Sequence, residues 1–349
     1  MSLTIINDPR VKYEKAVLNG KTYNYILAEP DCDPTGTVFL IHGWPDLSVG
    51  WRHQIPLLLS KGLRVVAPDM MGYGGTDAPE ELGFYTFKRT ADDIAALASY
   101  LGVSRIVLGG HDWGGAIVYR IAIWKPELIA ALFVISTPFT PPTINYVDQG
   151  LAIPTLHYQL QFRTDAVQDY IGLPQNATRI RQIMNTIFDA HTPDGEWAFN
   201  STGAGFDFEL LDQVVDDNAL MTTEELDFYV DNYMEDPFNR TLNWYRTSVL
   251  NWEDELALLP GNATYTDKFT QPALYIGGTQ DVALPPILST GMERYFDSLS
   301  RGEVNGTHWI MAELPDQVNG YIGNWLSSSV LGNLSLGLNM TAGSALALR

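Results

Sequence analysis

The pattern of hydrophobic and polar residues near the start of the chain predicts a β-hairpin. Two runs that alternate in polarity, 11–18 and 21–28, are separated by Asn19-Gly20. Asn-Gly suits two-residue hairpin turns because both of its positions tolerate a positive φ. We therefore expect two antiparallel strands at one edge of a sheet.

Further along the chain, short apolar runs alternate with segments of helical character. Such apolar runs are typical of strands buried on both faces, and they span 37–42, 63–68, 105–109, 129–136 and 272–277, with a weaker strand at 302–305. The helical segments between them are 51–60, 88–101, 115–124 and 315–327. Strands that alternate with helices predict an α/β fold, with a mostly parallel sheet and helices on both of its faces.

The alternation stops in the middle of the chain and later resumes. Residues 138–246 are rich in aromatic and acidic side chains and contain helix-compatible stretches, such as 179–190 and 223–233. We therefore expect a core domain made of residues 1–137 and 247–349, with 138–246 inserted between two strands as a helical cap domain, or lid.

The composition fits a soluble globular protein with a large negative charge. Of 349 residues, 46% are hydrophobic, and the formal net charge is −20. An acidic surface repels phosphate groups, so we expect no nucleic-acid partner and no docking on membranes. The single cysteine, Cys32, excludes an intrachain disulfide.

The expected location is the cytoplasm. The first residues lack a basic stretch followed by an apolar one, and no uncharged apolar run is long enough to span a bilayer. Seven N-x-S/T sequons leave secretion open, and they begin at Asn176, Asn200, Asn239, Asn262, Asn305, Asn333 and Asn339. The Asn305 sequon ends one residue before a candidate catalytic histidine, where a glycan would crowd the site.

The stretch GGHDWGG at 109–115 is typical of a nucleophile elbow. It follows a predicted strand and precedes a predicted helix, and its glycines permit a sharp turn that exposes the central side chain. Open α/β sheets bind ligands at this carboxyl edge. Asp112 is therefore the candidate nucleophile, although an aspartate at the end of a strand can instead cap the next helix.

Two later residues complete a candidate triad. His308 lies between the last predicted strand and the last helix, where the base of such hydrolases belongs, and Asp281 follows the strand 272–277. The order nucleophile, acid, base is that of hydrolases with this fold. No carboxylate follows the strand that ends at Ser136, which favours Asp281 as the acid.

The loop His42-Gly43-Trp44-Pro45 follows the first parallel strand and is the candidate partner of the elbow. The backbone N–H groups of Trp44 and Trp113 can converge on one anion as an oxyanion hole. We expect His42 to tie this loop together rather than to act as a base. The six histidines have no metal-ligand spacing, so we expect neither a metal nor another cofactor.

An aspartate at the elbow points to displacement at a saturated carbon. A carboxylate that attacks such a carbon forms an ester that water can cleave, whereas a serine would form a stable ether. The leaving group is then an epoxide oxygen, which needs proton donors, or a halide, which needs N–H donors such as indoles. Tyr158 and Tyr245 in the lid can supply two phenol donors, which favours the epoxide.

The chain resembles a soluble epoxide hydrolase of the α/β-hydrolase superfamily from about residue 11 to 328. The motifs that carry the resemblance are HGWP at 42–45, DMMGYGGTDAP at 69–79, GGHDWGG at 109–115, YQLQF at 158–162, LNWYR at 242–246, the Asp281 loop and THW at 307–309. The resemblance implies that Tyr158 and Tyr245 bind the epoxide oxygen, beside Trp113. Where the family's first lid motif often has a further aromatic, this chain has Gln161, which we expect to alter the pocket wall.

We therefore expect an enzyme that hydrolyses a small apolar epoxide to a vicinal diol, as a monomer or homodimer. Asp112 forms the ester, and His308, oriented by Asp281, activates water. One alternative is a haloalkane dehalogenase, which shares the aspartate and an indole like that of Trp113, with Trp44 placed to supply a second halide donor. The other is a non-catalytic ligand binder, although such proteins often lose part of the catalytic set.

Overall fold

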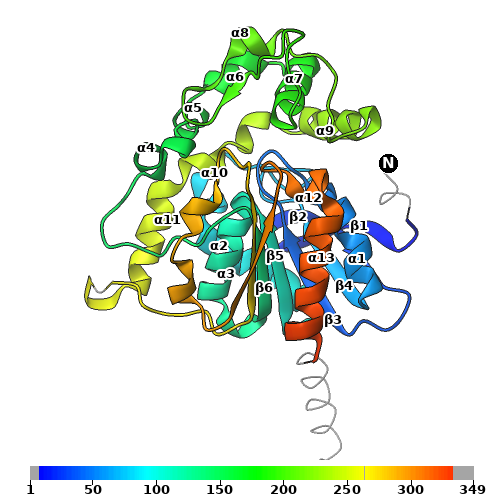
Figure 1. The fold of residues 1–349 in the computed structure, drawn as a ribbon, viewed down its shortest axis with the longest axis vertical. Coiled ribbons are helices and arrows are strands. Elements are labelled where there is room, and N and C mark those ends of the chain that lie inside the picture. Colours follow the sequence, from blue (N-terminus) through cyan, green and yellow to red (C-terminus); the bar gives the residue numbers. More distant parts are fainter. Residues whose placement is uncertain (1–7, 263, 333–349) are drawn as a thin grey trace, which may run out of the picture.

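A computed structural model of the protein describes residues 8–262 and 264–332, and its core is a sheet between two layers of helices (Figure 1). Within these residues the main sheet has eight strands in the order β1-β2-β4-β3-β5-β6-β9-β10. The strands are β1 (Val11–Leu18), β2 (Lys21–Ala28), β3 (Gly36–Ile41), β4 (Leu63–Pro68), β5 (Ile106–His111), β6 (Ile129–Ile135), β9 (Ala273–Gly278) and β10 (Leu299–Val304). Neighbours from β4 to β10 pair in parallel, and β1 and β2 pair antiparallel, as predicted.

Helices cover both faces of the sheet, which confirms the predicted architecture. One face carries α2 (Phe87–Tyr100) and α3 (Trp113–Trp124), and the other carries α1 (Ile55–Ser60) and α13 (Pro315–Trp325). The other α-helices are α4 (Gln149–Ala152), α5 (Gln159–Phe162), α6 (Ala166–Ile171), α7 (Ala177–Ile187), α8 (Phe208–Leu211), α9 (Thr223–Glu235), α10 (Asn243–Arg246), α11 (Ser248–Glu255) and α12 (Ile310–Glu313). The short 3-10 helices are η1 (Ser48–His53), η2 (Leu82–Tyr85), η3 (Pro126–Leu128), η4 (Pro154–Leu156), η5 (Phe238–Arg240), η6 (Leu256–Leu258), η7 (Pro260–Asn262), η8 (Pro286–Ser289) and η9 (Met292–Tyr295), and a π-helical turn, η10 (Leu326–Val330), follows α13.

Local chemistry explains where the predicted elements begin and end. Asn19 and Gly20 adopt φ values of 47° and 82°, so the hairpin turn forms where the sequence predicts it. The predicted helix 51–60 is instead two elements, η1 and α1, and Pro56 lies in the first turn of α1. Proline is favoured there because the first helical N–H groups have no intrahelical acceptor.

The inserted segment joins two neighbouring strands of the sheet. β6 and β9 pair in parallel, although the whole insertion separates them in sequence. Helices α4 to α9 lie beyond the carboxyl edge of the sheet, over the nucleophile elbow (Figure 1). The segment is mainly helical, as predicted, but it also contains a small hairpin of β7 (Phe199–Asn200) and β8 (Gly205–Phe206).

The described residues bear on two expectations about location, membrane spans and N-x-S/T sequons. No helix among residues 8–262 and 264–332 is long and apolar enough to cross a membrane. Three sequon asparagines accept side-chain hydrogen bonds: Asn176 caps α7, Asn200 accepts from Thr202, and Asn305 accepts from Thr279 and Gln280. The sequons at Asn333 and Asn339, the first seven residues and the tail after 332 lie outside the described residues.

Candidate active site

Asp112 lies in a strained turn between β5 and α3. Its φ is 53° and its ψ is −127°, a conformation that residues with a Cβ rarely adopt. The glycines around it are needed because backbone segments touch there. A Cβ on Gly114 would lie 2.0 Å from the carbonyl oxygen of Ile41, and one on Gly110 would lie 2.4 Å from the carbonyl oxygen of Gly114.

The Asp112 carboxylate is held by the loop after β3. The backbone N–H of Trp44 donates to Oδ1 at 2.8 Å, and the carboxylate makes no capping bond to α3, so the helix-cap alternative is wrong. Close approach requires glycine at position 43, where a Cβ would lie 2.2 Å from Oδ1. The N–H of Trp44, one predicted oxyanion donor, therefore binds the candidate nucleophile directly. The other, the N–H of Trp113, belongs to the first turn of α3, where N–H groups have no intrahelical acceptor.

His308 and Asp281 meet at the same edge of the sheet, next to Asp112. His308 Nδ1 lies 2.7 Å from Asp281 Oδ2, and His308 Nε2 lies 3.5 Å from Asp112 Oδ2. The Asp281 side chain is fully buried, and its Oδ1 accepts from the backbone N–H groups of Ala283 and Leu284 at 2.9 and 2.8 Å. These bonds fix the carboxylate in the orientation in which its other oxygen meets the imidazole.

The electrostatics of this cluster favour a protonated imidazole. Burial alone would lower the pKa of His308, but the carboxylates of Asp281 and Asp112 outweigh it and raise this pKa to about 10. The same imidazole holds the pKa of Asp281 below its usual value, although burial opposes this. The resting site is therefore an imidazolium between two carboxylates.

Two other histidines support the loops of the site. His42 donates from Nδ1 to the carbonyl of Gly43 and accepts at Nε2 from the N–H of Met70, both at 2.9 Å, so it ties two loops together as predicted. Burial lowers its pKa to about 4, which keeps it neutral. His111, which sequence reasoning left without a role, donates from Nε2 to the carbonyl of His308 at 2.9 Å. The position of His111 in the stretch GGHDWGG, next to Asp112, could have indicated that it supports the site.

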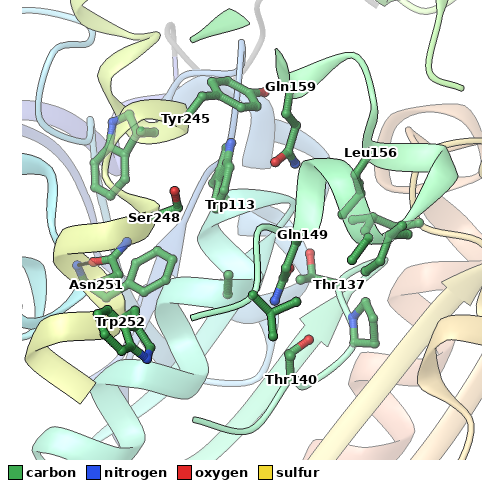
Figure 2. A pocket seen from close by; sticks show the side chains of 18 of the residues that line it. Trp113, Thr137, Thr140, Gln149, Leu156, Gln159, Tyr245, Ser248, Asn251 and Trp252 are labelled. Carbon is green, nitrogen blue, oxygen red and sulfur yellow. Dashed lines mark hydrogen bonds between the residues drawn. The ribbon is translucent and has the colours of Figure 1, made fainter. Parts of the chain in front are cut away.

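A cavity of about 350 Å³ is lined by Asp112 and Tyr158. Trp113 and Tyr245 also line it (Figure 2). The tyrosine rings lie 6.1 Å apart between centroids, and the ring of Tyr245 also meets the indole of Trp113 edge-on at 5.2 Å. Burial, reinforced by the nearby Asp112 carboxylate, raises the pKa of each phenol well above its usual value. Both phenols therefore remain protonated at neutral pH and can donate hydrogen bonds. His308 and Asp281 do not line this cavity.

The structure contradicts two expectations about the pocket, one for Trp44 and one for Gln161. The indole N–H of Trp44 donates to Thr241 Oγ1 at 3.0 Å, and Trp44 does not line the cavity, so this indole is not available to a bound halide. Gln161 also points elsewhere: its side-chain amide pairs with the backbone N–H and carbonyl of Phe206 in β8, at 2.8 and 2.9 Å. The expectation that Gln161 alters the pocket wall is therefore wrong.

Comparisons with known proteins agree with this geometry. A family model described as the alpha/beta hydrolase fold matches residues 36–315. The chain is 37% identical to an epoxide hydrolase of Neurospora crassa, over 92% of this chain and 96% of that protein. It is 31% identical to the bifunctional epoxide hydrolase 2 of Sus scrofa over 88% of this chain but 55% of that protein, so it spans about half the length of this longer relative. The crystal structure of epoxide hydrolase A from Mycobacterium thermoresistibile superposes with a TM-score of 0.76 at 28% identity, covering 91% of this chain and 99% of that one.

Proposed function

Because this chain belongs to the α/β-hydrolase fold family and, within it, to the epoxide hydrolases, we propose that it hydrolyses epoxides to vicinal diols through an ester on Asp112. The observation that carries the proposal is the place of Asp112, in a cavity beneath two protonated phenols and beside a His–Asp pair. The substrate is a small apolar epoxide, because most of the cavity wall is apolar, including Phe87, Leu156 and Trp244.

In the first step, Oδ2 of Asp112 attacks a carbon of the epoxide ring. The C–O bond of the ring breaks, its electron pair stays on oxygen, and Tyr158 or Tyr245 donates a proton to that oxygen. The Trp44 N–H binds Oδ1, which leaves Oδ2 as the attacking atom. Two phenols with raised pKa values support this role because both enter the reaction protonated.

In the second step, water attacks the carbonyl carbon of the ester. Once the ester has neutralised Asp112, the imidazolium of His308 gives its proton to the tyrosinate that the first step leaves. The neutral imidazole, oriented by Asp281, then accepts one proton of the water, and the negative charge develops on Oδ1 of Asp112. The N–H groups of Trp44 and Trp113 stabilise this charge. The intermediate collapses, the ester C–O bond breaks, and the alcohol leaves with a proton from His308. The remaining proton of the water passes from the Asp112 carboxyl group to His308 and restores the imidazolium, so the diol contains one epoxide and one water.

We also propose that residues 138–246 act as a cap domain on a core of 1–137 and 247–349. The cap supplies both phenols, and the core supplies the nucleophile, the base and the acid. Two facts support these boundaries: the strands on either side of the insertion are neighbours in the sheet, and α10 ends at Arg246 before α11 runs along α2.

A dehalogenase is the weaker alternative for this site. Halide release needs N–H donors aimed at the leaving group, and the second candidate donor, the indole of Trp44, is bonded to Thr241. A non-catalytic binder would not need the complete set of nucleophile, base, acid and phenols. Parallel assays of diol formation from epoxides and of halide release from chloroalkanes separate these functions, and we expect diol formation alone.

Isotope labelling tests the covalent route. A single turnover in ¹⁸O-water should place the label in the Asp112 carboxylate, because the water oxygen enters the ester carbonyl rather than the substrate. Mass spectrometry of the peptide that contains Asp112 detects it. Label that appears directly in the diol, with none in Asp112, would show that water attacks the epoxide itself.

A further inference from the structure

The loop that carries the Trp44 N–H is held from two sides. Between β3 and η1 this loop (residues 42–47) forms no helix or strand, so its position depends on its contacts. On the core side, the ring of His42 and a turn bond from the N–H of Asp46 to the carbonyl of Gly43 hold it. Further contacts come from the inserted segment, including two hydrogen bonds from α9.

One face of α9 presents three polar side chains to the core. Glu225, Tyr229 and Tyr233 are spaced four residues apart, so they lie in one row along the helix, and all three are buried. Glu225 forms a buried ion pair with Arg52 at 2.7 Å. A buried polar side chain without a partner is costly, so this row fixes where α9 rests on the core.

The two tyrosines of this row bond directly to the 42–47 loop. Tyr233 donates its O–H to the carbonyl of Pro45 at 2.6 Å, and Tyr229 donates its O–H to Asp46 Oδ1. Burial raises the pKa of both phenols, so both remain donors. The carbonyl that Tyr233 binds belongs to Pro45, the residue after Trp44, so the bond acts close to the Trp44 N–H.

We infer that Tyr229 and Tyr233 are positioning residues that aim the Trp44 N–H at Oδ1 of Asp112, so that the oxyanion hole is complete only while α9 is seated on the core. The inference rests on the proposed function. It adds that the inserted segment contributes to both steps: Tyr158 and Tyr245 act in ester formation, and α9 acts in ester hydrolysis.

The two steps depend on this N–H in opposite ways. During ester formation Oδ1 loses negative charge, so a looser Trp44 N–H costs little. During hydrolysis the charge returns to Oδ1 in the transition state, and a misplaced donor raises the barrier. Slower hydrolysis at an unchanged rate of ester formation lowers kcat and KM together, whereas kcat/KM stays nearly constant.

The experiment compares Tyr233→Phe and Tyr229→Phe with the wild type in single turnovers of one epoxide. Loss of a whole oxyanion donor costs about 10²–10³ in rate, so we expect the partial loss in each variant to slow ester hydrolysis about tenfold. The Asp112 ester should accumulate, as seen by mass spectrometry of the intact protein. Steady-state kcat and KM should fall together, with kcat/KM within about twofold of the wild type.

Tyr170→Phe is the matched control. Tyr170 is another buried tyrosine of the inserted segment, and its O–H bonds to Gln182 and Asp212, away from the 42–47 loop. Thr241→Val tests the same loop through a different contact, since it removes the bond to the Trp44 indole, and it should reproduce the accumulation of ester. Thermal midpoints of all variants separate a loss of folding from a loss of positioning.

Three results would overturn the inference: hydrolysis as fast as in the wild type, both steps slowed equally, or the same change in Tyr170→Phe. If the wild type forms an ester and both α9 variants hydrolyse it as fast as the wild type, only this inference fails. If the wild type forms no ester with any epoxide, the proposed function fails first and this inference falls with it.

Discussion

The imidazole of His308 lies between two carboxylates, with Nδ1 2.7 Å from Asp281 Oδ2 and Nε2 3.5 Å from Asp112 Oδ2. Of these two carboxylates, only Asp112 changes its charge during the proposed reaction, because ester formation neutralises it. Since that charge helps to raise the pKa of His308 to about 10, the pKa must fall once the ester forms. His308 can therefore lose its proton when the ester forms, before it has to act as a base.

This relationship predicts the pH dependence of ester hydrolysis. The rate should rise with pH as His308 loses its proton, and it should level off above the pKa that His308 has in the ester. This pKa should lie below the value of about 10 in the free enzyme. Rapid quenching of single turnovers, with the ester followed by mass spectrometry, measures this rate. In His308→Gln the ester should persist and its decay should lose this pH dependence. A rate in the wild type that is flat from pH 5 to 9 would contradict the assignment of His308 as base.

The same pKa predicts how stability changes with pH. His308 has a pKa raised from 6.5 to about 10 on folding, so folding favours its protonated form. Its contribution to the free energy of unfolding is complete below pH 6.5 and is lost as the pH rises toward 10. Chemical unfolding curves measured across this range should show the decline in the wild type. The decline should be smaller in His308→Gln, and an equal decline in both proteins would place its origin elsewhere.

Removal of the lid phenols should slow ester formation. Each of Tyr158→Phe and Tyr245→Phe removes one of two donors to the epoxide oxygen, and we expect each to slow the first step by about 10- to 100-fold, because a positioned acid contributes about 10²–10⁴ in rate. The double variant should form almost no ester. Stopped-flow fluorescence can follow the step, since Trp113 lies against Tyr245. Slower ester decay with normal ester formation would argue against this role.

Gly43 should tolerate no side chain. In Gly43→Ala the new Cβ would lie 2.2 Å from Asp112 Oδ1, so the carboxylate or the loop must move. We expect kcat/KM to fall about 100-fold or more, because small displacements of a reacting group are costly. Gly83→Ala is the control, since a Cβ there meets nothing within 4 Å and should leave kcat/KM unchanged. Comparable kcat/KM in the two variants would mean that the contact at Asp112 can relax.

The sequence by itself determined the sheet, the elbow and the order of the candidate triad. These features depend on local rules: apolar runs bury strands, Asn-Gly forms the hairpin turn, and only glycine fits beside the elbow. Chain order then places Asp112, Asp281 and His308 at one edge, because parallel strands share a direction. The residue type at position 112 also indicated the reaction class, since the ester of a carboxylate can be cleaved.

Only the tertiary structure decided where several side chains point. The indole of Trp44 bonds to Thr241, 197 residues away, and Gln161 pairs with the backbone of Phe206 instead of lining the pocket. Tyr229 and Tyr233 reach the loop after β3 from α9. The periodicity of a sequence identifies the buried face of a helix, but not the segment which that face meets. Which segment a helix face meets depends on how distant elements pack. This packing determines which polar groups lie around Asp112.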